Sequence, residues 1–534
     1  MTRPRLVIAV YCLLIFGPWL GSARTFTYHE SFTAQNAREM LATGDWLIPR
    51  VGGRPWLEKP PLPQWCAAAF GLIGGRVDEF WARLPAALFG LCGVLALTDL
   101  VVRIKGASAG VLAGVCLASM TSIQTYARLA EPDIFLWAIV VAALAEFGRF
   151  SVANESIDSK RSSLRFFILL GLTQTAKGPL FGAAMVLAPI ALWLLVHRGR
   201  GLRWLIHPIG WIACLAIALA WPLAVLQIHP EALELWKYHT LGRLDSGIAY
   251  NPKPFWYYAT TLPWQAAPAF LFALPALWPS LKRAWSSAGL DRFLWFWFAA
   301  QFAMLSAASG KHHHYLISAL VPFAVWAAEG LAWFATLARR LWSISWYRIA
   351  SLLLSISAIA AAAMILEKQG RVAACEVPAI GSAVLAGIVA ASECCRRERF
   401  TAAAISFALT LAVAAVYINA VWLPRTDIYK PEGEFARRVD ETCGPEMHFV
   451  VYNTEPPRLL IDFTRPVTFF KNDPEQLRTY GREHGTPFVI FTSEYCRMEI
   501  EPLLQIEELD RTPSARWPGD LTSQPVAYRV IGTK

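Results

Sequence analysis

Long apolar runs recur along most of this chain, and they constrain its fold more than any other feature. A helix needs about 20 mainly apolar residues to cross a bilayer core of roughly 30 Å. Only 16% of the 534 residues are charged, whereas soluble domains carry about a quarter. The sequence therefore predicts an α-helical polytopic membrane protein with about 13 transmembrane helices, whose apolar runs centre near positions 14, 93, 115, 140, 170, 188, 214, 268, 300, 326, 356, 385 and 412.

The basic residues predict which side of the membrane each loop occupies. The net charge is +10, and the lysines and arginines concentrate in short loops between the apolar runs. This pattern is typical of topology control and not of a nucleic-acid-binding surface. With a cytoplasmic N-terminus and a retained anchor at Leu6–Leu20, all of these loops fall inside. Residues 22–75 then form one external loop, whose second half lies along the membrane surface or dips into it. We expect a multi-pass protein of the inner (plasma) membrane.

The composition changes after Leu423. Residues 424–534 are rich in charge, and short apolar stretches alternate with helix-like segments. We therefore expect a transmembrane domain at 1–423, followed by a small extracytoplasmic α/β domain at 424–534. Cys443 and Cys496 would be able to form a disulfide outside the cytoplasm, and the sequence leaves their pairing open.

Unusual ionisable residues gather at the ends of the apolar runs on the predicted outer side. Ionisable side chains at membrane depth are costly and by default indicate a function. A transporter or lipid flippase would also need them, but nearer the middle of the membrane and in repeated halves. A membrane scaffold whose tail binds partners gives no reason for them. Their clustering on one face favours an enzyme that works at the outer surface, and the members are His29, Glu30, Glu58, Lys59, Arg128, Glu131, Asp133, Lys177 and Lys311 to Tyr315.

Several motifs point to a family. The stretch "HESFTAQNAREMLATGDWLIPRVGGRPWLEKPPLPQW" is followed in order by "ARLAEPD", "TQTAKGP", "YHTLGRL", "PFWYYATTLPW" and "SGKHHHYL". The series resembles the polyprenyl-phosphate-sugar-dependent glycosyltransferases (GT-C type), relatives of the protein O-mannosyltransferases and of the lipid A aminoarabinose transferases. The resemblance covers residues 1–423. It implies an integral-membrane glycosyltransferase that moves a sugar from a polyprenyl phosphate to a lipid, glycan or protein acceptor at the outer face of the membrane.

Cations are needed where the donor phosphate leaves, because negative charge develops there. Four basic residues on the predicted outer side are candidates: Lys59, Lys177, Arg243 and Lys311. The two prolines after Lys59 hold its backbone extended. The resemblance further associates the lysine of "EKPP" and the tyrosine of "KHHHY" with the donor phosphate, which implies Lys59 and Tyr315. The other reading of Lys59 is a lysine that snorkels to the interface.

A carboxylate is expected to activate the acceptor or to steady the positive charge on the sugar ring. The resemblance implies an acidic pair in the first external loop, where this chain has His29 and Glu30. We favour Glu30 as the base, and the alternative is a structural cap for the helix near 31–41. Asp133 matches the second acidic position of the family, and helix N-capping is its alternative.

The resemblance also implies a divalent metal, which would be zinc, magnesium or manganese. Glu58 and His239 match positions that are linked to a metal in some relatives, although two ligands alone are a weak signal. For the donor lipid we expect an apolar groove lined by Trp46, Trp56, Trp65 and residues 255–258. Anchoring of these aromatic side chains at the membrane interface is the alternative. The sequence identifies neither the sugar nor the acceptor.

Overall fold

The computed structural model describes residues 2–153, 159–178, 180–199, 201–241, 252–368, 376–427, 430–453, 462–463, 467–470, 472–512 and 525–534. The chain forms two compact units. Unit 1 comprises Met1–Leu20, Leu57–Pro63 and Arg83–Arg425, and unit 2 comprises Gly21–Trp56, Gln64–Ala82 and Thr426–Lys534.

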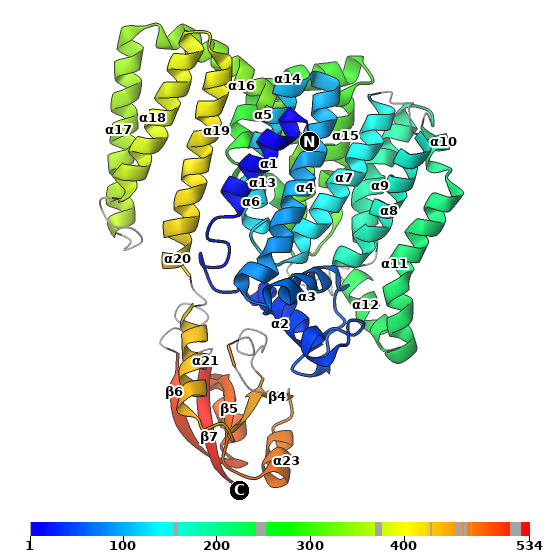
Figure 1. Ribbon diagram of the computed structural model, residues 1–534, viewed down its shortest axis with the longest axis vertical. Coiled ribbons are helices and arrows are strands. Elements are labelled where there is room, and N and C mark those ends of the chain that lie inside the picture. Colours follow the sequence, from blue (N-terminus) through cyan, green and yellow to red (C-terminus); the bar gives the residue numbers. More distant parts are fainter. Residues whose placement is uncertain are drawn as a thin grey trace. The chain divides into compact units, whose positions relative to one another are not determined.

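Unit 1 is built from helices (Figure 1). Many are long and apolar, and neighbours in sequence often pack together, as α17, α18 and α19 do. Their bounds are α1 Arg3–Phe16, α4 Glu79–Lys105, α5 Ala107–Ala118, α6 Thr121–Tyr126, α7 Pro132–Ser151, α8 Ser159–Lys177, α9 Phe181–Val196, α10 Leu202–Leu205, α11 Pro208–Ile228, α12 Ala232–Leu241, α13 Tyr257–Gln265, α14 Ala269–Ser286, α15 Leu290–Ala307, η1 His313–Leu320, α16 Val321–Trp342, α17 Ser345–Lys368, α18 Glu376–Arg396, α19 Phe400–Tyr417, η2 Ile418–Trp422 and α20 Leu423–Arg425.

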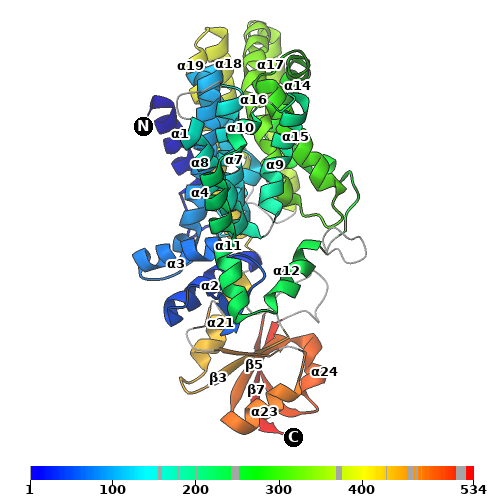
Figure 2. The ribbon, with the colours of Figure 1, turned by 90° about the vertical axis from the view of Figure 1, so that its right-hand side faces the viewer.

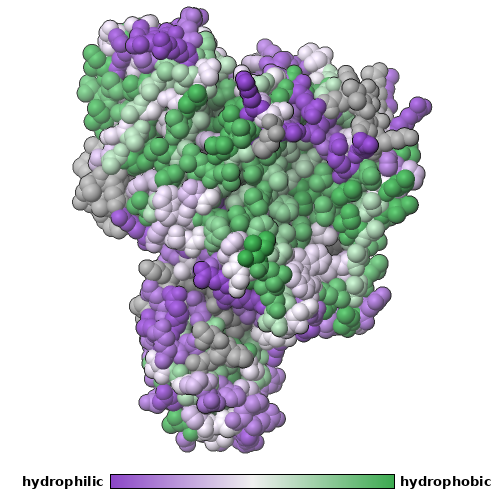
Figure 3. Space-filling model, in the orientation of Figure 1, coloured by the Kyte–Doolittle hydropathy of each residue, from purple (hydrophilic) through white to green (hydrophobic). Residues whose placement is uncertain are grey.

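The helices of unit 1 are those of a multi-pass membrane protein. Among the described residues, six helical stretches are long and apolar enough to cross a bilayer. Hydrophobic side chains cover much of the surface over these helices (Figure 3). The predicted polytopic helical fold is therefore confirmed, while the count of about 13 spans stays a prediction. The six stretches are Glu79–Lys105, Pro132–Ser151, Pro208–Ile228, His313–Trp342, Pro378–Arg396 and Phe400–Arg425.

Unit 2 contains the C-terminal α/β fold that the sequence predicted. Its five-stranded sheet has the order β4-β3-β5-β7-β6, in which β3 runs parallel to β4 and β5, and β7 runs antiparallel to β5 and β6. Figure 2 shows β3, β5 and β7 of this sheet beside α23. The elements are α21 Lys430–Thr442, β3 His448–Tyr452, β4 Val467–Phe470, α23 Glu475–His484, β5 Phe488–Ser493, η3 Glu494–Cys496, α24 Arg497–Ile500, β6 Leu504–Arg511 and β7 Pro525–Thr533.

Alternation along the strands gives this sheet two separate apolar faces. Helix α21 packs on one face, together with Phe449 and Val451 of β3. Helix α23 packs on the other face, together with Val450 and Tyr452. The sheet is therefore covered on both sides.

The predicted external loop contributes to the first of these faces. Its elements in unit 2 are α2 Tyr28–Thr43, β1 Arg50–Val51, β2 Arg54–Pro55 and most of α3 Leu62–Gly74. Phe32, Val51 and Trp56 pack with the side chains of α21, β3 and β5. The backbone N–H and the hydroxyl of Thr25 both donate to Asp427, at 2.7 and 2.9 Å. The domain boundary at 423/424 stays a prediction, and most of the external loop belongs with the C-terminal residues.

The two cysteines of the C-terminal region are both free thiols. Cys443 lies in the cluster on the α21 face, and Cys496 lies in the cluster on the α23 face. The sheet separates them, so the disulfide that the sequence left open is not formed.

Candidate functional site

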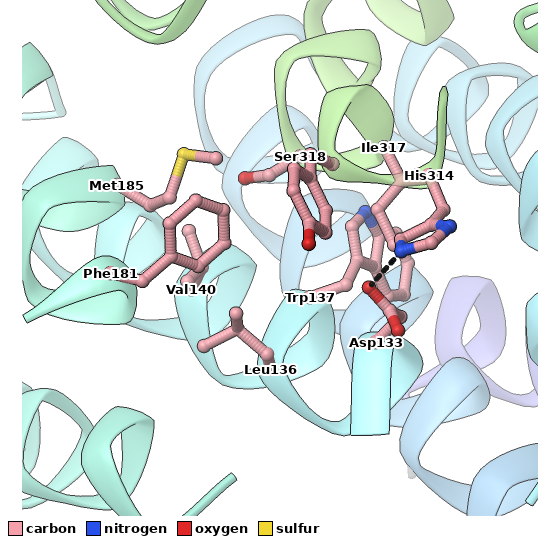
Figure 4. Close-up of a pocket in the computed structure, with 10 residues that line it drawn as sticks. Asp133, Leu136, Trp137, Val140, Phe181, Met185, His314, Ile317 and Ser318 are labelled. Atoms are coloured by element: carbon pink, nitrogen blue, oxygen red, sulfur yellow. Dashed lines mark ion pairs between the residues drawn. The ribbon is translucent and has the colours of Figure 1, made fainter. Parts of the chain in front are cut away.

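The start of α7 carries the carboxylate at the centre of the candidate site. Pro132 occupies the first turn, where its missing N–H costs nothing. Glu131 is the N-cap residue, so Asp133 is not the cap that the alternative reading proposed. Instead, Asp133 forms an ion pair with Lys177, and its Oδ1 lies 3.7 Å from Nε2 of His314. Figure 4 shows Asp133 and His314 directed toward each other.

Lys177 is the last residue of α8 and connects the carboxylate to an aromatic wall. Its Nζ lies 4.2 Å from the ring centroid of Tyr315 and 5.7 Å from that of Phe181. The side chains of Lys177 and Asp133 are each only 7% exposed. Two buried charges need each other and further polar contacts to offset their desolvation. The ion pair and the aromatic faces supply these contacts.

Lys59 lies within electrostatic range of this pair. Burial, and then the positive charge of Lys177, lower the pKa of Lys59, while the charges of Asp133 and Glu131 oppose that shift. Within the described part of the chain, no carboxylate reaches ion-pair distance of Lys59. Within the described residues, the ammonium group of Lys59 therefore lacks the kind of ion pair that holds the ammonium group of Lys177 to Asp133.

The segment that carries Lys59 is fixed on both sides of it. The carbonyl oxygen of Leu57 accepts a hydrogen bond of 2.7 Å from Nε1 of Trp236 in α12. Pro60 lies beside Gly178, the residue after α8, since a Cβ added to that glycine would be 4.0 Å from Cδ of the proline. Gly178 has a φ of +106°, a conformation that L side chains rarely adopt.

An apolar pocket opens beside the charged group (Figure 4). It is narrow, with a cavity volume of about 10 Å³, which is room for about one water molecule. Ligand sites commonly combine such an apolar wall with a few polar groups. The polar lining comes from Asp133, His314 and Ser318, and the remaining lining comes from Leu136, Trp137, Val140, Phe181, Met185, Tyr315 and Ile317.

Three consecutive histidines turn in different directions at η1. His314 faces Asp133, whereas Nε2 of His313 lies 3.1 Å from the hydroxyl of Tyr126. The backbone carbonyl of His312 accepts a hydrogen bond of 3.2 Å from the hydroxyl of Tyr258. The contact between His314 and the carboxylate was missed by the sequence analysis. The "KHHHY" motif was a signal, but of its members only Lys311 and Tyr315 were assigned a role.

Lys311 lies close by in sequence but makes other contacts. It is 2% exposed, and burial lowers its pKa. Its Nζ donates to the carbonyl oxygen of Lys253 at 3.0 Å and to that of Ala308. These bonds fix the chain before η1. The predicted contact of Lys311 with a phosphate stays a prediction, and Arg243 lies outside the described residues.

The predicted metal ligands do not form a site in the described residues. Glu58 is exposed, and the side chain of His239 lies outside the described ones. In the ranges that the structure describes, no group of three or more His, Cys, Asp or Glu side chains could hold a metal ion. The metal stays a prediction.

Glu30 and His29 belong to unit 2. Thr27 and Glu30 form a capping box at the start of α2: Oε2 of Glu30 accepts from the N–H of Thr27 at 2.9 Å, and Oγ1 of Thr27 accepts from the N–H of Glu30 at 3.3 Å. Glu30 is completely buried, and His29 is exposed. Glu30 therefore has the structural role that was its alternative, and a catalytic role for either residue stays a prediction.

The aromatic residues expected along a lipid groove have several environments. Trp65 donates to the carbonyl oxygen of Trp46 at 2.7 Å within unit 2, where Trp56 packs against the sheet. In unit 1, Phe255 and Trp256 are 71% and 55% exposed. Exposed aromatic rings suit both a groove and an interfacial anchor, so the lining of a groove stays a prediction.

Known sequences resemble this chain over part of its length. Residues 58–227 match the family described as dolichyl-phosphate-mannose-protein mannosyltransferase. The undecaprenyl phosphate-alpha-4-amino-4-deoxy-L-arabinose arabinosyl transferases of Shewanella sediminis (strain HAW-EB3) and Edwardsiella ictaluri (strain 93-146) are 29% and 28% identical to it, over 61% and 55% of this chain. These matches cover 59% and 53% of the two relatives, so the chain matches less than two thirds of their length.

Solved structures share the fold over nearly the whole chain. The crystal structure of ArnT from Cupriavidus metallidurans bound to undecaprenyl phosphate has a TM-score of 0.78 at 20% identity, covering 98% of this chain and 97% of that one. The apo oligosaccharyltransferase of Archaeoglobus fulgidus has a TM-score of 0.51 at 12% identity, covering 92% and 69%. The predicted resemblance to the polyprenyl-phosphate-sugar-dependent glycosyltransferases of the GT-C type is thus confirmed.

Proposed function

We propose that this protein, with its GT-C type fold, is a glycosyltransferase that moves a sugar from a polyprenyl phosphate to a lipid, glycan or protein acceptor. The observation that carries the proposal is the buried group of Asp133, Lys177 and Tyr315 with Lys59 in electrostatic range, beside an apolar pocket. Such a site suits a ligand with a charged head and an apolar tail. The relatives' names support undecaprenyl phosphate as the carrier and 4-amino-4-deoxy-L-arabinose as the sugar.

The proposed reaction substitutes one oxygen for another at the anomeric carbon. An acceptor hydroxyl attacks this carbon, and the electrons of the broken bond pass to the departing polyprenyl phosphate. Lys59 meets the growing negative charge on the phosphate, because a cation placed there stabilises the transition state more than the ground state. Tyr315 adds a hydroxyl donor at the same place.

Asp133 is the catalytic carboxylate in this proposal. Its charge is maintained by Lys177, and an ionised carboxylate can steady an oxocarbenium-like sugar or accept the proton of the acceptor hydroxyl. Glu30 stays the other candidate for the proton acceptor. The position of Lys177 orients the carboxylate, which favours catalysis because less reorganisation is needed during the reaction.

The site is proposed to face the outside of the inner membrane. The basic loops between the apolar runs support this orientation through the positive-inside rule. The same rule puts the C-terminal α/β elements on the outer side. The acceptor is then any hydroxyl-bearing or phosphate-bearing envelope molecule that reaches the pocket from that side.

Transfer by the purified protein is the test. The full chain in detergent would be incubated with radiolabelled undecaprenyl-phosphate sugars, first aminoarabinose and then mannose, together with membrane extract as the acceptor source. We expect transfer by the wild type and a large loss in Lys59→Ala and Lys177→Ala. Lys237→Ala is the matched control, since that side chain is 51% exposed in a surface pair with Glu234. Absence of transfer from every donor, together with movement of a labelled lipid across vesicles, would instead support a flippase.

A further inference from the structure

The pocket beside Asp133 contains two buried polar atoms that the described part of the chain does not pair. Trp137 is 1% exposed and Ser318 is 4% exposed, and both residues line this pocket. Among the described residues, neither Nε1 of Trp137 nor Oγ of Ser318 has a hydrogen-bond partner. The large majority of buried side-chain polar atoms in native proteins do have one. Two exceptions that line the same pocket therefore indicate a partner from outside the chain.

Helix α7 fixes the indole of Trp137 close to the carboxylate of the site. Trp137 follows Asp133 by one turn of the helix, so the two side chains lie on the same helix face. The indole packs tightly on α4, where a Cβ added to Gly93 would lie 2.3 Å from Cζ3 of the ring. Figure 4 shows Trp137 on the same side of the pocket as Asp133 and His314. The polar side of the pocket is thus formed by the start of α7 and by η1.

Ser318 contributes the second of these polar atoms from η1. Side chains three residues apart in a 3₁₀-helix eclipse each other, so Ser318 and Tyr315 lie on the same side of η1. The carbonyl oxygen of Ser318 accepts a hydrogen bond of 3.0 Å from Nε1 of Trp297 in α15. This bond fixes the backbone that carries the hydroxyl. Ser318 is therefore a fixed part of the pocket wall.

The carboxylate of Asp133 retains the capacity to accept further hydrogen bonds. An ionised carboxylate has about four lone-pair sites, and Lys177 donates to one oxygen, Oδ1. Nε2 of His314 lies 3.7 Å from the same oxygen, which is longer than an ordinary hydrogen bond. The pocket thus combines an acceptor in Asp133, a donor in the indole of Trp137, and the hydroxyl of Ser318, which can act as either.

These groups select the chemical class of the partner. A ligand group in the pocket must accept from the N–H of Trp137, donate to the carboxylate of Asp133, and fit a cavity of about 10 Å³. A hydroxyl does all three, since it is a donor and an acceptor and has about the size of a water molecule. An ammonium group has no lone pair with which to accept. An ionised phosphate has no proton to donate, and the carboxylate would repel it.

We propose that this pocket is a subsite for one hydroxyl group of the donor sugar, which accepts from Trp137 and donates to Asp133, with Ser318 as an additional polar contact. In the free protein, a water molecule takes the place of the sugar hydroxyl. The cavity is too small for a sugar ring, so only a substituent of the ring enters it. The subsite rests on the proposed function and extends it, because it makes Trp137 a residue that determines which sugar is bound.

Donor binding by the full-length protein in detergent tests the subsite. Isothermal titration calorimetry would compare undecaprenyl-phosphate aminoarabinose with its 2-deoxy and 3-deoxy forms, and with undecaprenyl phosphate, which carries no sugar. We expect the wild type to bind one of the two deoxy forms about 10- to 100-fold more weakly than the parent donor, because a hydrogen bond to a charged group is lost. Equal affinity for the parent donor and both deoxy forms, or no binding of any of them, would overturn the proposal.

Two buried tryptophans provide a matched pair of variants. Trp326 is also completely buried, and its Nε1 also lacks a partner among the described residues, but it does not line this pocket. Trp137→Phe should bind the parent donor about 3- to 10-fold more weakly and should discriminate less against the deoxy form. Its affinity for undecaprenyl phosphate should equal that of the wild type. Trp326→Phe should keep both the affinity and the discrimination of the wild type.

Two serines provide a second pair, which decides the matter if Trp137→Phe fails to fold. Oγ of Ser306 is buried without a partner among the described residues, and Ser306 does not line the pocket. Ser318→Ala should weaken binding of the parent donor by about 3-fold, whereas Ser306→Ala should not. Equal weakening for undecaprenyl phosphate and for the sugar donors would indicate lost structure and overturn the subsite. Discrimination between the sugars without transfer to any acceptor would retain the subsite and reject the glycosyltransferase proposal.

Discussion

Removal of the lysine from the Asp133–Lys177 pair should destabilise the protein strongly. Lys177→Met keeps much of the length of the side chain but deletes its charge, and Asp133 remains 7% exposed with His314 at 3.7 Å. Breaking one side of a buried ion pair typically costs about 3–5 kcal/mol. Since the charge of Lys59 also acts on Asp133, we expect the lower end of this range, about 3 kcal/mol.

The opposite change should cost less. Asp133→Asn leaves the ammonium of Lys177 over the ring of Tyr315, 4.2 Å from its centroid. A desolvated cation–π contact is worth about 2 kcal/mol, so part of the lost attraction is retained. The double variant Asp133→Asn/Lys177→Met contains neither charge, and it should be more stable than the sum of the single losses by up to about 3 kcal/mol.

Denaturant unfolding of the four proteins in one mild detergent measures this cycle. The midpoint should shift without a change in slope, because the surface exposed on unfolding stays the same. Lys237→Met is the control, and its exposed pair with Glu234 should be worth about 0.2–1 kcal/mol. If the losses of the single variants simply added in the double variant, the two charges would not stabilise each other, and the electrostatic account of this site would be refuted.

Three further expectations concern single residues. Glu30→Ala should lose about 0.5–2 kcal/mol of stability through the lost cap, whereas Glu30→Gln should keep the capping box; reduced transfer by a stable Glu30→Gln protein would reveal a catalytic carboxylate. Burial and Lys177 lower the pKa of Lys59, so this lysine should lose its charge, and donor binding should weaken, at a lower pH than an ordinary lysine would require. Donor KM measured across pH should show this weakening in the wild type and not in Lys59→Arg, which stays protonated. Lys311→Met should lose about 1.5–3 kcal/mol, because its carbonyl acceptors lose a charged donor, with an unchanged donor KM; a raised KM would instead support its predicted contact with phosphate.

The sequence predicted the helical membrane fold because apolar runs report directly on burial in a bilayer. It also selected Lys59, Asp133, Lys177 and Tyr315, which the structure brings into one group. Each of these residues stands at the end or the start of a helix or beside one, where an ionisable group is unusual and thus conspicuous. The geometry among them could not be predicted, since the contact of His314 with Asp133 joins positions 181 residues apart (314 − 133).

The capping box at Glu30 and the packing of Trp56 differ in how far the sequence alone indicates them. The capping box of Thr27 and Glu30 has its signature in the sequence, a threonine followed three residues later by a glutamate. The family resemblance favoured catalysis at Glu30, and this cap was its alternative. By contrast, no local pattern indicates that Trp56 packs with the C-terminal sheet. Contacts of this range depend on tertiary structure and not on propensity.

The two lysines of the site are in different electrostatic states, which suggests a division of labour between them. Lys177 is buried against Asp133 and two aromatic rings, so its charge is already used in the protein's own structure. Lys59 has no ion pair within the described residues, and its pKa is lowered by burial and by Lys177, so a neutralising anion would stabilise its charged form. An incoming phosphate is such an anion. Loss of Lys59 should therefore affect donor binding with little cost in stability, and loss of Lys177 should affect both, because it also leaves Asp133 without its partner.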